Sequence, residues 1–214
     1  MRESFNSQLE RLHAELILMG ALCEDAIACA VKGLIDEDAE LRGKVSRLER
    51  EIDGKEREIE DFCLRLLIRE QPVACDLRRI NAAQKLISNM ERIGDQALDI
   101  AEISAFTAGS YIKSDVHISD MARATVTMLQ KSIDSFITLD LAGARETIAN
   151  DDTVDGLFLK IKGELVYEIA ENPALGGECL DLLMIAKYLE RIGDHAVNIA
   201  EQVIYTVTGE RVNA

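Results

Sequence analysis

Two acidic segments of this chain have the residue types and the spacing needed to bind a cation. ERIGDQALDIAE covers residues 91–102, and ERIGDHAVNIAE covers residues 190–201, 99 positions later. The two copies differ at only three of their twelve positions. Carboxylates are the ligands that hard cations prefer, so a duplicated acidic motif points to metal binding in both halves of the chain.

Helical geometry places the carboxylates of each segment on one side of a helix. At ~100° per residue, Asp95, Asp99 and Glu102 all lie within ~80° of Glu91. No Lys or Arg falls inside this stripe or inside its second copy. Like charges four residues apart destabilise an isolated helix by ~0.2–0.5 kcal/mol per pair, so we expect a cation from elsewhere to compensate each stripe.

A second acidic pair precedes each motif. Glu49 and Asp53 share one helix face, and Asp151 and Asp155 stand 102 positions later. A short turn lets consecutive helices run antiparallel, which brings each pair beside its motif. The expected metal ligands are therefore Glu49, Asp53, Glu91, Asp95, Asp151, Asp155, Glu190 and Asp194, with Asp99, Glu102, Asn198 and Glu201 as weaker candidates.

Two interpretations of the acidic stripes remain open: a metal site or solvated helix faces. The stripes could be solvated helix faces, although a matched second pair in two copies favours a site. Oxygen ligands alone would suit Mg²⁺, Mn²⁺, Ca²⁺ or iron.

Gly94 and Gly193 indicate that the helix backbone needs clearance at these positions, because a glycine inside a helix costs ~1 kcal/mol relative to alanine. A neighbouring helix or a metal–hydroxide cluster would fill that space.

The elements that must position these residues are six long helices. Apolar residues at alternating three- and four-residue steps predict helices over 4–35, 39–69 and from 76, and again over 118–139, 141–171 and from 175. Asp36 or Asp38 is expected to cap the second helix, and Pro72 to end it. Length alone permits one six-helix bundle, but the repeat favours an all-α fold of two tandem, pseudo-symmetric three-helix bundles. We place these at residues 1–107 and 108–214, linked through 104–116.

Composition excludes several classes of function. A net charge of −15 argues against nucleic acid and against anionic lipid as partners. No apolar run approaches the ~20 residues that cross a bilayer, and the first residues lack the apolar segment of a signal peptide. Five widely spaced cysteines are typical of buried thiols in a reducing compartment. We therefore expect a soluble, cytoplasmic protein without direct membrane insertion.

The motifs of this chain resemble those of the PhoU family of phosphate regulators. The resemblance covers nearly the whole chain and rests on the paired ERIGD segments at 91–95 and 190–194, on QPVACDLRRI at 71–80, and on IYTVTGERV at 204–212. It implies two three-helix bundles related by a pseudo-two-fold axis. It also implies multinuclear clusters of iron, zinc, manganese or magnesium at E/DxxxD motifs. Their counterparts here are Glu91 with Asp95, Glu190 with Asp194, Glu49 with Asp53, and Asp151 with Asp155.

The resemblance further implies an adaptor and not an enzyme. Such an adaptor contacts the ATPase of a phosphate ABC transporter and a sensor histidine kinase, and it represses phosphate uptake and the phosphate-starvation two-component response. The resemblance also implies a homodimer. Asp99 stands where its counterpart is Asn198, so we expect the two metal sites to load unequally.

Two other functions compete with the adaptor. A carboxylate-bridged di-iron oxidase requires Glu-x-x-His pairs on two helices, but Gly94 and Gly193 occupy the third position after Glu91 and Glu190. A purely structural helical scaffold would use the acidic stripes only for solubility.

Overall fold

Six long helices form almost all of the structure, a computed structural model that describes residues 2–73, 75–107 and 116–210. The all-α prediction is confirmed, and most predicted helix ends lie within two residues of the observed ones. The short 3₁₀ helix η1 precedes the last long helix, which starts one residue later than predicted. The elements are α1 (Arg2–Ile35), α2 (Ala39–Glu70), α3 (Cys75–Ser104), α5 (Ile118–Thr138), α6 (Leu141–Glu171), η1 (Pro173–Leu175) and α7 (Gly176–Thr208).

The helix ends follow from local side-chain chemistry. Asp38 caps α2, because its carboxylate accepts hydrogen bonds from the backbone N–H groups of Glu40 at 2.8 Å and Leu41 at 3.2 Å. Asp140 caps α6 in the same way. These groups would otherwise lack a partner at a helix N-terminus. At the other end of α2, Gln71 adopts a left-handed conformation with φ of 46° before Pro72. The predicted cap and the predicted stop are both confirmed.

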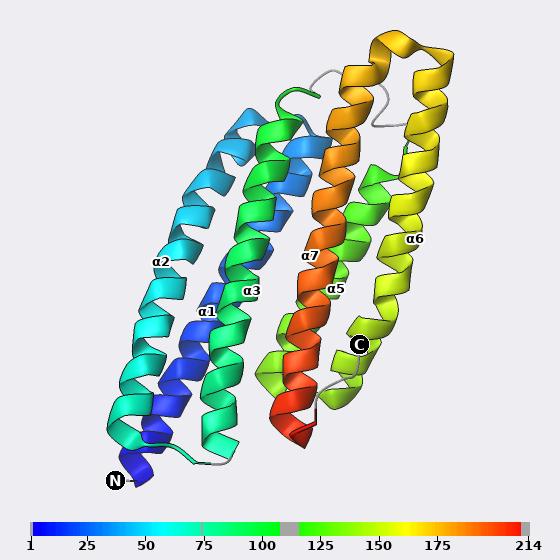
Figure 1. The fold of residues 1–214 in the computed structure, drawn as a ribbon. Helices are drawn as coiled ribbons and strands as arrows, with labels where there is room; N and C mark the ends of the chain where they lie inside the picture. Colours follow the sequence, from blue (N-terminus) through cyan, green and yellow to red (C-terminus); the bar gives the residue numbers. More distant parts are fainter. Residues whose placement is uncertain (1, 74, 108–115, 211–214) are drawn as a thin grey trace.

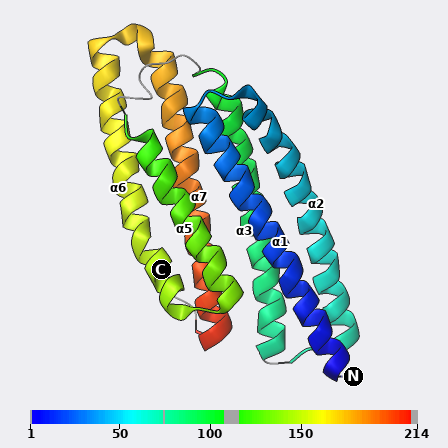
Figure 2. The same cartoon turned by 180° about the vertical axis from the view of Figure 1, so that it is seen from behind.

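The helices pack as two bundles side by side. Helices α1, α2 and α3 form the first, and α5, α6 and α7 form the second. Figures 1 and 2 show α2, α3, α7 and α6 in one layer, with α1 and α5 behind it. Two tandem, pseudo-symmetric three-helix bundles are therefore confirmed. The predicted boundary between residues 107 and 108 stays a prediction, because residues 108–115 lie outside the described part.

One continuous core joins the two bundles. Helices α3 and α7 run antiparallel and contact each other as extensively as neighbours inside a bundle do. Ile93 and Ala97 of α3 and Ile192 and Ala196 of α7 are fully buried in the shared apolar cluster. Four cysteines are buried as predicted, whereas Cys75 is exposed. Within the described residues, no helix combines the length and apolarity needed to cross a membrane.

The glycines of the repeated motif admit a side chain from the neighbouring helix. A Cβ atom at Gly94 would lie 3.1 Å from Cδ1 of Ile52, and one at Gly193 would lie 3.4 Å from Cγ1 of Val154. Of the two occupants that the sequence left open, the neighbouring helix therefore fills the space in both halves. Gly54, in contrast, has no such neighbour within 4 Å.

Alanine substitutions should separate these two kinds of glycine. Gly54→Ala is expected to stabilise the protein by ~0.5–1 kcal/mol, because alanine loses less chain entropy and meets no neighbour. At Gly94 the same gain is offset by the displacement of Ile52. Urea denaturation should therefore place Gly94→Ala below Gly54→Ala in free energy of unfolding. Equal stabilisation by both changes would contradict the close approach at Gly94.

Candidate metal centre

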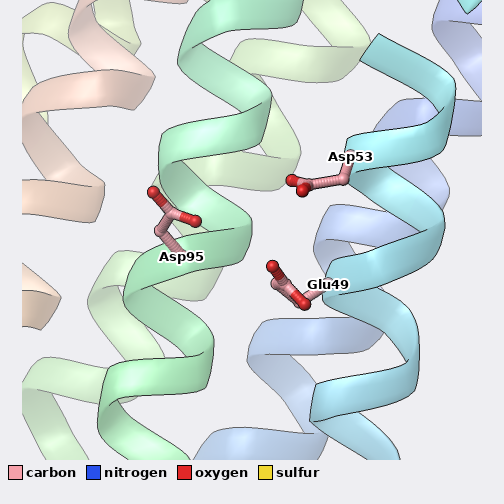
Figure 3. Close-up of side chains that lie close together, drawn as sticks. All are labelled: Glu49, Asp53 and Asp95. Carbon is pink, nitrogen blue, oxygen red and sulfur yellow. The ribbon is translucent and has the colours of Figure 1, made fainter. Parts of the chain in front are cut away.

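Three carboxylates from two helices meet in the first half of the chain. Glu49 and Asp53 project from α2 and Asp95 projects from α3, as Figure 3 shows. Each residue offers one carboxylate oxygen, and these three oxygens lie within 4.8 Å of one another. All three residues are half-buried. Two oxygens on opposite sides of one bound cation are ~4–5 Å apart, since metal–oxygen distances are ~2.0–2.6 Å. The donor set therefore fits a hard cation.

Packing between α2 and α3 produces this convergence. Ile52, next to Asp53, inserts against Gly94, which is next to Asp95. Because these apolar contacts lie one residue away from the carboxylates, they fix the distance between the two acidic helix faces. The same relation holds between Val154, beside Asp155, and Gly193, beside Asp194.

Burial and nearby carboxylates raise the pKa of Glu49 and Glu91 at the first cluster. Burial raises the pKa of Glu49, and the charges of Asp53 and Asp95 raise it further. The predicted ligand Glu91 borders the same cluster, because burial and then Asp95 raise its pKa. Burial and nearby like charge both disfavour the ionised form, so a cation placed here would relieve both effects.

Glu56 is a member of this acidic face that sequence reasoning missed. Burial raises its pKa first, followed by the charges of Glu60 and Asp53. The available signal was its position three residues after Asp53, which puts both on one side of α2. The repeat hid it, because its counterpart in the second half, 102 positions later, is Phe158.

The second half gathers its four predicted ligands more loosely. Burial, followed by the charge of Asp155 and then Asp194, raises the pKa of Asp151 from 3.8 to about 6. Burial and then Glu190 raise the pKa of Asp194. These shifts show that the four carboxylates face one another across α6 and α7. Among the described residues, however, only the first half brings three ligand atoms within 4.8 Å of each other.

Basic side chains compensate part of the acidic charge in both halves. Arg92 lies 3.2 Å from Asp95 and 3.4 Å from Glu91. In the second half, Lys187 pairs with Glu190 from one turn earlier. Residues three apart on a helix are neighbours on its surface, so both are local contacts that helical spacing allows.

The weaker candidates lie apart from the three-carboxylate set. Asp99 faces α7, where burial raises its pKa and the neighbouring Tyr188 lowers it. Glu102 and Asn198 are exposed, and Glu201 is half-buried. None of these four belongs to the set formed by Glu49, Asp53 and Asp95.

His195 of the second motif links the two bundles. Its Nδ1 lies 2.9 Å from Oδ1 of Asn89 on α3. The amide nitrogen of Asn89 donates to the carbonyl of Lys85, so Oδ1 is the acceptor and His195 Nδ1 carries the proton. Burial and the charges of Arg92 and Arg191 lower the pKa of His195, which keeps the ring neutral.

Comparison with known proteins agrees with this architecture. The family model described as "PhoU domain" matches residues 16–104 and 118–203. The chain belongs to the PhoU family. It is 37% identical to a phosphate-specific transport system accessory protein PhoU homolog of Deinococcus radiodurans, over 99% of this chain and 100% of that one. It is 34% identical to the homolog of Clostridium acetobutylicum, over 99% and 98% of the two chains.

Solved PhoU structures share the fold. The crystal structure of PhoU from Pseudomonas aeruginosa superposes with a TM-score of 0.89 at 36% identity, covering 96% of this chain and all of that one. The phosphate transport system regulatory protein PhoU from Streptococcus pneumoniae gives a TM-score of 0.90 at 23% identity, covering 98% of this chain and 100% of that one. This second likeness bears on the fold alone.

The raised pKa of Asp151 predicts a pH dependence of the metal-free protein. The folded state holds this proton more tightly than the unfolded state, so the carboxyl supports folding when protonated. That contribution falls as the pH rises from about 4 to about 6, and ionised Asp151 destabilises the fold above this range. Asp151→Asn should therefore raise the melting temperature at pH 7 in the presence of a chelator and flatten its fall between pH 4 and 6.

Asp61→Asn provides the control, because it removes an exposed carboxylate of α2 outside both acidic sites. Calorimetric melts of both variants across this pH range decide the matter. Identical pH profiles for Asp151→Asn and the unmodified protein would contradict the assigned role of Asp151.

Proposed function

We propose that this protein is a cytoplasmic, metal-binding adaptor of the phosphate-specific transport system. It acts as a negative regulator of phosphate uptake and of the phosphate-starvation two-component response. The observation that carries the proposal is the convergence of Glu49, Asp53 and Asp95 in a family whose members are named as accessory proteins of this transport system. A cytoplasmic location agrees with an accessory role at a transporter.

The residues that would hold the metal ion are Glu49, Asp53 and Asp95, with Glu91 at the border of the site. When bound, a divalent or trivalent ion such as iron, zinc, manganese or magnesium would supply positive charge to this cluster. The second site would use Asp151, Asp155, Glu190 and Asp194. Because each site spans two helices, its occupancy would couple the spacing of α2 and α3, or of α6 and α7, to the metal content of the cell.

The two competing functions have weaker support. An oxidase would need the missing Glu-x-x-His pairs, and the relatives are named as accessory proteins. A scaffold without metal would leave unexplained why burial and repulsion are concentrated on the same carboxylates in both halves.

Removal of one carboxylate should lower the metal content of the first site. We expect Asp95→Asn to weaken Mn²⁺ binding there by about tenfold or more, because one charged ligand of the three is lost. Equilibrium dialysis followed by elemental analysis measures the effect. Glu51→Gln removes an exposed carboxylate from α2 and serves as the control. If both variants bind as much Mn²⁺ as the unmodified protein, the metal assignment is wrong.

Exposed apolar side chains on α6 support the partner part of the proposal. Leu159 is 65% exposed, Val166 is 61% exposed, and Tyr167 is 64% exposed. Leu159 and Val166 are seven residues apart and therefore share one face of the helix. Exposed apolar surface of this kind is typical of contacts with other proteins. We assign the α6 face to the proposed partners, which are the transporter ATPase, the sensor histidine kinase and a second copy of this chain.

A charge on this face should weaken partner binding. We expect Val166→Glu to reduce retention of the ATPase and of the kinase in pull-down assays, or to shift a homodimer toward monomer in light scattering. Leu64→Glu is the matched control, because Leu64 is the α2 counterpart of Val166 and is 45% exposed. If the unmodified protein retains neither partner and its deletion leaves phosphate uptake unchanged, the adaptor function is wrong.

A further inference from the structure

Three arginines line a cavity between α1 and α2, near the turn that joins α2 to α3. The cavity has a volume of about 200 Å³, and Arg11 of α1 lines it together with Arg65 and Arg69 of α2. The other lining residues are Gln8, Phe62, Leu66 and Glu70. Three guanidinium groups therefore surround this cavity with a single carboxylate among them, although the chain as a whole has a net charge of −15.

The ring of Phe62 positions two of these arginines. Phe62 is only 8% exposed, so core packing fixes its ring. Cζ of Arg11 lies 5.1 Å from the ring centroid, and Cζ of Arg65 lies 5.9 Å from it. A guanidinium near an aromatic face is attracted by the ring electrons. The two cations are thus brought together from two helices before any ligand binds, which lowers the entropy lost on binding.

Nearby carboxylates leave these arginines without an ion pair. Within the described residues, none of the three lies within 4.0 Å of a carboxylate oxygen. In the adjoining cavity along α2, Glu15 and Glu58 are both paired with Lys55. Asp61 of the same cavity is four residues from Arg65 but does not pair with it. The N–H groups of the three guanidiniums therefore remain available to a ligand.

Local helix chemistry and the internal repeat do not account for the cluster. Arg69 lies in the last turn of α2, where the helix dipole favours a cation. That explanation does not extend to Arg11, which lies in the N-terminal third of α1. The positions 102 residues after Phe62, Arg65 and Arg69 hold Glu164, Tyr167 and Glu171. The repeat therefore does not impose the cluster, which points to a function of the first half alone.

We propose that Arg11, Arg65 and Arg69 form a binding site for a phosphate group. The tetrahedral oxygens of phosphate accept hydrogen bonds from several guanidiniums at once, whereas one bidentate arginine satisfies a carboxylate. A phosphate monoester carries a charge of about −1.5 to −2 at pH 7, which matches three arginines and one glutamate. A cavity of about 200 Å³ suits a small anion better than a drug-sized molecule.

The phosphate site is separate from the candidate metal centre. Phe62 lies nine residues after Asp53, ~14 Å further along α2, and no residue of one site belongs to the other. The ligand is a phosphate oxyanion, either free in solution or carried on a phosphorylated side chain of a partner protein.

Calorimetric titration of chelator-treated protein with inorganic phosphate at low salt tests the site. Arg65→Gln should weaken binding by about tenfold, because charge-assisted hydrogen bonds are lost. Arg69→Gln should also weaken it. Arg65→Lys should not restore full affinity, because lysine keeps the charge but lacks the planar fork. Arg47→Gln is the matched control: it removes an exposed arginine of α2 with the same change in net charge, ~27 Å along the helix from Arg65.

A phosphoserine peptide titrated in parallel identifies the source of the phosphate group. Binding of free phosphate that depends on Arg65 supports a small-molecule site, and binding of the peptide alone supports a site for a phosphorylated partner. If neither probe binds, or if Arg47→Gln weakens binding as much as Arg65→Gln does, the proposal is overturned. Because these titrations exclude metal, they stand whether or not the protein binds Mn²⁺.

Discussion

The antiparallel packing of α3 against α7 is the contact on which the rest of the structure depends. It merges two three-helix bundles into one core, and the repeated motif supplies both of its surfaces. Ile93 and Ile192 are buried in that core at 0% exposure. Because the motif is helical, the orientation that buries its apolar residues in the core also fixes the direction in which its carboxylates point. The motif therefore contributes both to core packing and to the geometry of the candidate site.

A glycine beside each carboxylate extends this constraint to a second helix. Gly94 admits Ile52, and the close approach of α2 to α3 then brings Glu49 and Asp53 to Asp95. A larger residue at Gly94 would relieve the cost of a helical glycine, but it would separate the acidic faces. Gly94 is unfavourable in a helix, but it allows the close approach that the candidate site requires. Such conflicts between local stability and function are common.

Much of this could be predicted from sequence, because it depends on local or periodic signals. The capping by Asp38, the stop at Pro72 and the pairing of Glu49 and Asp53 with Asp95 all follow from spacing along one chain. Other contacts were not predicted. A helical wheel gives the angle of Asp99 but not its neighbour, so its contact with Tyr188 was missed. The pairing of Arg92 with Asp95 and of Lys187 with Glu190 was left out because the search considered only acidic residues.

The repeat itself both revealed and concealed the sites. Comparison of the halves drew attention to the positions that they share, so residues without a like counterpart were missed. The charges at matched positions differ in both directions: Glu56 and Arg57 correspond to Phe158 and Leu159, and Ser88 corresponds to Lys187. Each half keeps its carboxylates but pairs them with different basic side chains, Arg57 with Asp53 in the first half and Lys187 with Glu190 in the second.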